Sequence, residues 1–242
     1  MCEMCRRNSI ARFEPSRRSV LGAAVSTMGL LLASAAGAKE KAPPKPQNVL
    51  TPAASLERLK RGNARYVEGV SLRHDFKHER EALAGGQNPY AAVLSCADSR
   101  IAPEYAFDSG RGDLFVCRVA GNFANDESVA SLEYAVAELG TPLILVLGHD
   151  ACGAVSATIK SLKDNTTLPG HLPSLVEAIA PAVKAVSQQA GDTLANAIRQ
   201  NVIDNVGKLS TATPILSAAV EQNKLKVVGG IYRLRDGRVE MV

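Results

Sequence analysis

Continuously apolar runs recur along the chain and predict buried strands. They span residues 90–95, 114–119, 142–148 and 226–232. Strands that are apolar along their whole length are typical of parallel sheets with both faces covered. Between two of these runs, Val129, Leu132, Val136 and Leu139 recur near the helical period, and Gly140 follows where that helix, 128–139, would end. The alternation of strands and helices predicts an α/β fold with a central, mainly parallel sheet flanked by helices.

The remaining segments complete this expected order. Further helices are predicted over 55–70, 152–162, 174–189, 193–206 and 215–222, with a loop over 165–173. The 55–70 segment is amphipathic and predicts an N-terminal helical arm that lies on the surface or against a partner. A final hairpin is predicted from the 226–232 strand through Asp236-Gly237 to residues 239–242.

The first 38 residues have the layout of an export signal. Arg17-Arg18 precede a mildly apolar, Ala- and Gly-rich stretch, and Ala36-Gly37-Ala38 offers a small-residue cleavage pattern. This predicts a twin-arginine signal peptide over 1–38 and a periplasmic or secreted mature protein. An uncleaved membrane anchor and a chance Ala-rich helix are the alternatives. Because the stretch is short and polar for a stable span, no membrane span is expected after processing.

Charge and composition limit the kinds of partner that the rest of the chain is expected to bind. Most of the net charge of +4 belongs to residues 1–38, so the mature part is close to neutral and nucleic acid is not an expected partner. Residues 39–50 contain several prolines among lysines and predict a flexible lead-in. The length from 51 to 242 fits one domain, and aliphatic residues and alanine must supply its core because aromatic residues are only 4%.

Candidate metal ligands follow two of the predicted strands. Cys96 comes directly after the 90–95 run, and His149 and Cys152 follow the 142–148 run. Carboxyl ends of parallel strands share one edge of a sheet, so one crevice could hold all three side chains. Two thiolates and one imidazole suit Zn²⁺, and three protein ligands leave a fourth position for water, as in a catalytic zinc site. The alternative is that these are ordinary buried cysteines.

A charged pair next to Cys96 favours the metal site. Asp98 and Arg100 lie two and four residues after Cys96. The end of a core strand has no structural need for both a carboxylate and a guanidinium. This pair therefore indicates chemistry at the same position.

These motifs resemble the β-class carbonic anhydrases over nearly the whole mature part, 51–242. The resemblance rests on Cys96-Ala97-Asp98-Ser99-Arg100, Val119-Ala120-Gly121-Asn122, Ser131-Leu132-Glu133-Tyr134-Ala135 and Gly148-His149-Asp150-Ala151-Cys152-Gly153. It implies one Zn²⁺ per chain, bound by Cys96, His149 and Cys152. It also implies that Arg100 holds Asp98 off the metal while Asp98 orients the zinc-bound hydroxide.

The resemblance extends to a set of substrate-binding positions. Gln87, Phe115 and Tyr134 match positions of the plant-like branch, in which the fourth zinc position is open, and Gly153 belongs to the same pocket by its place in the motif. Without the resemblance, Gln87 would be interpreted as a surface loop residue, and Phe115 and Tyr134 as core.

The implied activity is the reversible hydration of CO₂ to bicarbonate and a proton by a zinc-bound hydroxide. The family also implies a homodimer or a larger homo-oligomer. Two alternatives remain open: a hydrolase of CS₂ or COS on the same scaffold, and a non-catalytic periplasmic zinc-binding protein.

Overall fold

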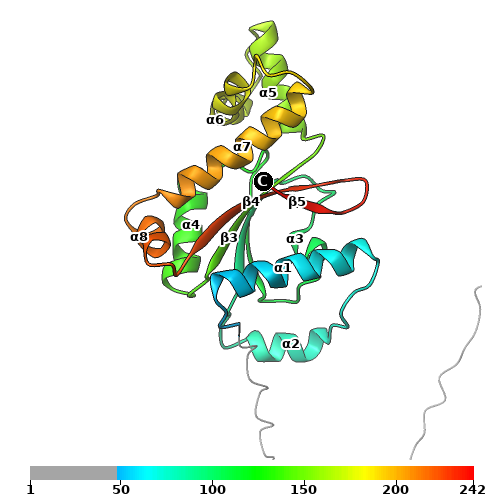
Figure 1. Ribbon diagram of the computed structural model, residues 1–242, viewed down its shortest axis with the longest axis vertical. Helices are drawn as coiled ribbons and strands as arrows, with labels where there is room; N and C mark the ends of the chain where they lie inside the picture. The colour runs from blue at the N-terminus through cyan, green and yellow to red at the C-terminus, as the bar shows by residue number, and fades with distance from the viewer. Residues whose placement is uncertain (1–47) are drawn as a thin grey trace, which may run out of the picture. The chain divides into compact units, whose positions relative to one another are not determined.

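A single five-stranded sheet forms the centre of the fold. In the computed structural model, which describes residues 48–242, the strand order is β2-β1-β3-β4-β5 (Figure 1). The strands are β1 Ala91–Ser95, β2 Leu114–Arg118, β3 Leu143–His149, β4 Lys226–Tyr232 and β5 Val239–Met241. The first four are mutually parallel, and β5 pairs antiparallel with β4. This confirms the predicted mainly parallel sheet and the terminal hairpin.

The central strands are apolar throughout because both of their faces are covered. Every residue of β1 and of β3 is buried. Along β1, Ala92 and Leu94 face one hydrophobic cluster, and Ala91 and Val93 face a second one on the opposite side. The period-two alternation of a strand therefore serves two cores here.

Eight helices accompany the sheet in the part of the chain that the structure describes. They are α1 Pro52–Val67, α2 Phe76–Leu83, α3 Pro103–Ala106, α4 Asp126–Ala137, α5 Gly153–Asp164, α6 Leu172–Ala185, α7 Thr193–Ser210 and α8 Ile215–Glu221. The predicted helices are confirmed with boundary shifts of a few residues. The loop between α5 and α6 is also where it was predicted.

Helix α1 packs on one face of the sheet of its own chain. Its Leu59 is 1% exposed and belongs to the cluster that contains Leu145 of β3. At Gly62 a Cβ atom would lie 1.9 Å from the carbonyl oxygen of Phe107, so only glycine allows this close approach. Just before α1, at the end of the predicted lead-in, the buried Asn48 donates to Asp113 Oδ1 at 2.9 Å.

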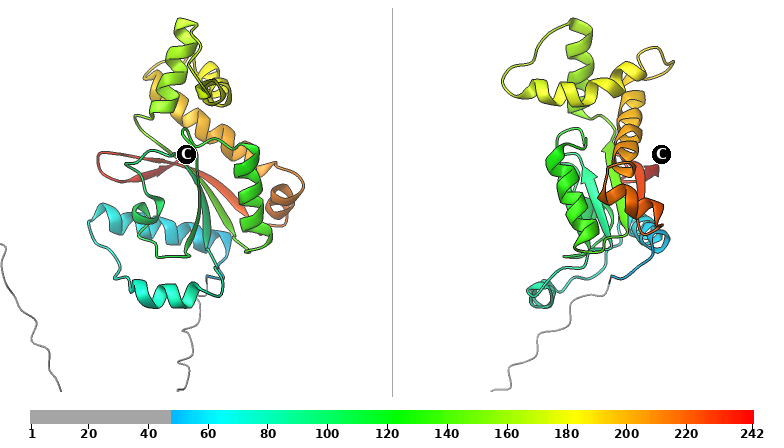
Figure 2. Two further views of the ribbon diagram at one scale, coloured as in Figure 1. Left: turned by 180° about the vertical axis from the view of Figure 1, so that it is seen from behind. Right: turned by 90° about the vertical axis from the view of Figure 1, so that its left-hand side faces the viewer.

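Helices α4, α7 and α8 cover the opposite face, and α5 and α6 pack beside α7 beyond the sheet (Figures 1 and 2). Buried side chains from α4, α6, α7 and α8 join one cluster with β1 and β3, for example Leu132, Ile179, Val202 and Leu216. The sheet is thus covered on both faces, as predicted from its apolar strands.

The sequence patterns missed two helices. Helix α2 is eight residues long, holds only three apolar residues and has no buried residue, which is too short a run to establish a helical period. Helix α3 is only four residues long. The signal peptide predicted over 1–38 and residues 39–47 of the lead-in lie outside the described residues. Within 48–242, no helix is both long and apolar enough to cross a membrane.

Candidate metal centre

Three metal-ligating side chains meet at the carboxyl edge of the sheet. Cys96 follows β1, His149 is the last residue of β3, and Cys152 is the N-cap residue of α5. Their ligand atoms all lie within 4.8 Å of one another, and all three residues are buried. Strands β1 and β3 are parallel neighbours, which brings their carboxyl ends together. The predicted convergence of these residues is confirmed.

The imidazole of His149 is oriented for metal binding. Its Nδ1 lies 2.8 Å from the carbonyl oxygen of Asp150, which can only accept, so Nδ1 carries the proton. In the neutral ring, Nε2 is then the unprotonated nitrogen. Nε2 is buried and has no hydrogen-bond partner among the described residues. A buried lone pair without a donor fits a metal ligand, because burial without a partner is otherwise costly.

Cys96 is held by a glycine with a left-handed backbone. The N–H of Gly121 donates to Cys96 Sγ at 3.3 Å. Gly121 has a φ of 90°, and a Cβ atom at this position would lie 2.6 Å from Cδ1 of Ile179. Only glycine satisfies both the dihedral angle and the space. A backbone N–H aimed at sulfur stabilises the thiolate form that a metal requires.

The sulfur atoms of Cys96 and Cys152 lie within 4.8 Å of each other. The interaction with Cys152 lowers the pKa of Cys96 to about 4, and the same interaction together with burial raises the pKa of Cys152. Burial lowers the pKa of His149, but the Cys96 thiolate outweighs that effect and the net direction is upward. The cluster therefore attracts positive charge, as a proton or as a metal ion.

Asp98 and Arg100 form a bidentate ion pair beside the cluster of metal-ligating residues. Arg100 Nε donates to Asp98 Oδ1 at 2.9 Å, and Nη2 donates to Oδ2 at 2.7 Å. This hydrogen bonding holds the pKa of Asp98 well below its usual range. Asp98 Oδ2 lies 3.8 Å from His149 Nε2, which is too far for a hydrogen bond. The carboxylate is thus ionised, next to the ligands, and restrained by a guanidinium.

The structure reveals supporting residues that the sequence patterns did not single out. Arg118, at the end of β2, donates from Nε to the carbonyl of Cys96 at 3.0 Å and from Nη2 to that of Asp98 at 2.7 Å. Gly121 and Asp150 also support the centre, and although both stand within the motifs named above, no role was predicted for either. A charged residue at the end of a largely apolar strand was the available signal for Arg118. No pattern in the sequence near Arg118 indicates that it would donate to the carbonyls of Cys96 and Asp98.

Unlike the three metal-ligating residues, the predicted substrate-binding residues are not shown to form one cluster. Phe115 on β2 and Tyr134 on α4 lie together, with ring centroids 6.4 Å apart, and Tyr134 is 50% exposed. Gln87 is exposed in the segment between α2 and β1. Gly153 opens α5, and a Cβ atom added there would meet no other atom within 4 Å. Their binding roles stay predictions.

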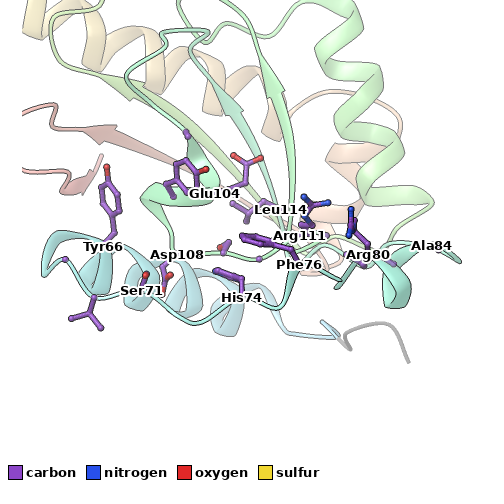
Figure 3. A pocket seen from close by; sticks show the side chains of 18 residues that line it. Tyr66, Ser71, His74, Phe76, Arg80, Ala84, Glu104, Asp108, Arg111 and Leu114 are labelled. Atoms are coloured by element: carbon purple, nitrogen blue, oxygen red, sulfur yellow. The ribbon is translucent and has the colours of Figure 1, made fainter. Parts of the chain in front are cut away.

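A large cavity of about 1000 Å³ lies elsewhere, between the α1–α2 connection and α3 (Figure 3). Its lining includes Tyr66, Phe76, Tyr105 and Leu114, and none of the three metal-ligating residues contributes to it. This large cavity is therefore not the metal centre.

Comparison with known proteins identifies the family. Residues 91–239, more than half of the chain, match the family described as carbonic anhydrase. The chain belongs to the β-carbonic anhydrase family. A carbonic anhydrase of Mycolicibacterium smegmatis is 39% identical over 192 residues, which are 78% of this chain and 93% of that protein. Carbonic anhydrase 2 of Mycobacterium tuberculosis is also 39% identical, over 77% of this chain and 91% of its own length.

Solved structures of the family share the fold. The β-carbonic anhydrase CcaA superposes with a TM-score of 0.59 at 30% identity, over 77% of this chain and 94% of its own. One of two tetrameric β-carbonic anhydrases of Sordaria macrospora gives a TM-score of 0.61 at 25% identity, over 78% of this chain and 94% of its own. The family assignment and the α/β fold agree with the resemblance read from the motifs.

Proposed function

We propose that the chain is a carbonic anhydrase that hydrates CO₂ reversibly to bicarbonate and a proton, with one Zn²⁺ held by Cys96, His149 and Cys152. The observation that carries this is the convergence of two thiols and one oriented imidazole within 4.8 Å, in a member of the β-carbonic anhydrase family. Two sulfur ligands and one nitrogen ligand suit Zn²⁺ better than Mg²⁺ or Ca²⁺, which prefer oxygen. When bound, Zn²⁺ supplies a Lewis acid that makes water nucleophilic near neutral pH.

The chain's own residues orient the reactants. The Asp98 carboxylate accepts a hydrogen bond from the attacking nucleophile and so aims its lone pair at the carbon of CO₂. Arg100 keeps that carboxylate in place through two parallel hydrogen bonds. In this proposal Phe115 offers CO₂ an apolar wall, with Tyr134 and Gly153 beside it. Gln87 donates a hydrogen bond to the oxygen on which negative charge develops.

Stopped-flow CO₂ hydration by the zinc-loaded protein tests the proposal. We expect fast hydration that is lost in Cys96→Ser, together with the bound zinc. Asp98→Ala should keep its zinc and lose rate, which would separate metal binding from orientation of the nucleophile. Wild-type protein that binds zinc but does not hydrate CO₂ would contradict the proposal. Hydrolysis of CS₂ or COS by that protein would then favour the hydrolase, and inactivity on all three would favour zinc binding alone.

We further propose a homodimer or larger homo-oligomer. Exposed aromatic side chains support it, because Phe76 is 59% exposed and Tyr105 is 75% exposed at the large cavity. The tetrameric relatives from Sordaria macrospora are consistent with it. Sedimentation equilibrium of the protein would measure the state, and a monomer at micromolar concentration would contradict it.

The proposed location is the periplasm or the medium, reached by the twin-arginine route. The support is the Arg17-Arg18 pair ahead of an apolar stretch and Ala36-Gly37-Ala38. Cell fractionation of the wild type and of an Arg17→Lys/Arg18→Lys double variant tests it. Export should require the arginine pair, and equal export of both proteins would exclude this route.

A further inference from the structure

Asp150 lies in the turn that carries His149 and Cys152, and it is hydrogen-bonded to the terminal β4–β5 hairpin. We propose that Asp150 is a positioning residue for the metal centre, whose carboxylate fixes the 149–152 turn so that His149 and Cys152 keep their places. This inference rests on the zinc centre proposed above. It assigns Asp150 no contact with metal or substrate, and it makes the β4–β5 hairpin part of the metal centre's support.

Three hydrogen bonds carry the proposal. The carbonyl of Asp150 accepts the Nδ1 proton of His149 at 2.8 Å, which sets the tautomer and the ring direction. The backbone N–H of Asp150 donates to the carbonyl of Tyr232 at 3.1 Å. Its side-chain Oδ1 accepts the N–H of Leu234 at 2.9 Å. Asp150 is therefore held through both its backbone and its carboxylate, and His149 is oriented by a group that cannot move freely.

The turn needs this external support because its backbone is strained. Ala151, between Asp150 and Cys152, has a φ of 53°, in the left-handed region that a residue with a Cβ atom rarely adopts. Such a conformation persists only where surrounding contacts impose it. Cys152 comes directly after this residue, so relaxation of the turn would move its sulfur away from Cys96 and His149.

The β4–β5 hairpin, whose Leu234 N–H donates to Asp150, is itself hydrogen-bonded to α1. Asn63 of α1 is buried and donates from Nδ2 to the carbonyl of Gly237 at 2.8 Å. Its Oδ1 accepts the N–H of Val239 at 2.9 Å. These contacts fix the hairpin to α1 near its turn. The chain of contacts from α1 through the hairpin to Asp150 ends at the imidazole of His149.

A position-based role and a charge-based role predict opposite results for two conservative variants. Asp150→Asn keeps an Oδ1 acceptor in the same place and removes the charge. Asp150→Glu keeps the charge and moves the oxygens by one methylene. Asp150→Ala removes both. Asp236→Ala is the matched control, because Asp236 lies in the same hairpin and its Oδ1 also accepts a backbone N–H, from Arg238 at 3.0 Å.

The experiment measures zinc affinity of the full-length proteins by competition with a chromophoric chelator, and records the visible absorption of the Co²⁺ forms. We expect Asp150→Ala and Asp150→Glu to weaken zinc binding about 10-fold and to alter the Co²⁺ spectrum. Asp150→Asn and Asp236→Ala should match the wild type in both readouts. Should Asp150→Ala fail to fold, the comparison of Asn with Glu still decides the question.

Two results would overturn the inference while leaving the proposed zinc centre intact. Wild-type affinity and spectrum in Asp150→Ala or Asp150→Glu would show that the carboxylate positions nothing. Loss in Asp150→Asn with retention in Asp150→Glu would assign the effect to charge instead. A wild-type protein that binds neither Zn²⁺ nor Co²⁺ would contradict the proposed function itself, and this inference with it.

Discussion

The two turns that supply the metal ligands are held by different groups. The first, residues 96–100, is fixed by side chains: Arg100 holds Asp98 from a position where its own side chain is 54% exposed, and Arg118 reaches back to two carbonyls of the turn. The second, residues 149–152, surrounds a fully buried His149 and is held from within by Asp150, through its backbone N–H and carbonyl and through its carboxylate. A fixed imidazole and a carboxylate held at the solvent edge suit different tasks. The second turn supplies two of the three metal ligands, and the first supplies the third ligand together with the carboxylate beside the metal centre.

Removing one metal ligand from each turn should have the largest effect. Cys96→Ser and His149→Ala should both lose zinc and bring CO₂ hydration down to the uncatalysed rate, because a catalytic zinc site is built on three protein ligands. Zinc content and stopped-flow rates measure this. Substantial activity in either variant would mean that the two turns do not form one centre.

Removing the carboxylate should affect rate alone. Asp98→Ala is expected to reduce kcat/KM by about 10²-fold, as for loss of a group that orients a proton transfer, while zinc stays bound. Arg100→Lys keeps a positive charge but loses the bidentate hydrogen bonding to Asp98. Its rate should therefore fall between those of Asp98→Ala and the wild type. If Asp98→Ala lost its zinc instead, the carboxylate would be needed to keep the metal bound, and its role would not be limited to orientation.

Gly121 tests the structural support of the first turn. Gly121→Ala combines a left-handed φ with a clash against Ile179, and should lower the free energy of unfolding by about 2 kcal/mol. Gly207→Ala is the control, because Gly207 lies within α7 with open space around it and should gain stability by about 0.5 kcal/mol. Urea denaturation measures both, and equal midpoints would mean that the Gly121 site can relax.

Arg118 should show the smallest effect. Arg118→Met removes both donors to the first turn but leaves Asp98, Arg100 and the ligands in place, so we expect a loss of about 10-fold in kcat/KM. Arg118→Lys, which can reach one carbonyl, should recover part of it. A zinc affinity as weak as that of Asp150→Ala would contradict the distinction between the turns.

Local patterns predicted most of the sheet and the ligands, because both are encoded within short windows. The buried strands β1 and β3 are apolar at almost every position, and Cys96 and His149 stand at their ends. The supports could not be predicted in the same way. Asp150 and Leu234 are separated by 84 positions, and Arg118 and Cys96 by 22, so only the folded topology brings them together.

Helix α2 shows a different limit of the sequence patterns. It spans only eight residues with three apolar side chains, so its pattern is too short to be told from a loop. Its one local sign is the N-cap, where Asp75 accepts the N–H of His78 at 3.2 Å. A capping residue ahead of so short and polar a segment is too common in loops to predict a helix by itself.

The parallel pairing of β1 with β3 also sets an order of events during synthesis. Parallel strands cannot be joined by a tight turn, so the chain must complete β2 and α4 before β3 can align with β1. Cys96 therefore leaves the ribosome long before its two partners, as a lone thiol with no metal site around it. High-affinity metal capture has to wait for the crossover to close, and much of the binding free energy then appears as stability of the finished sheet.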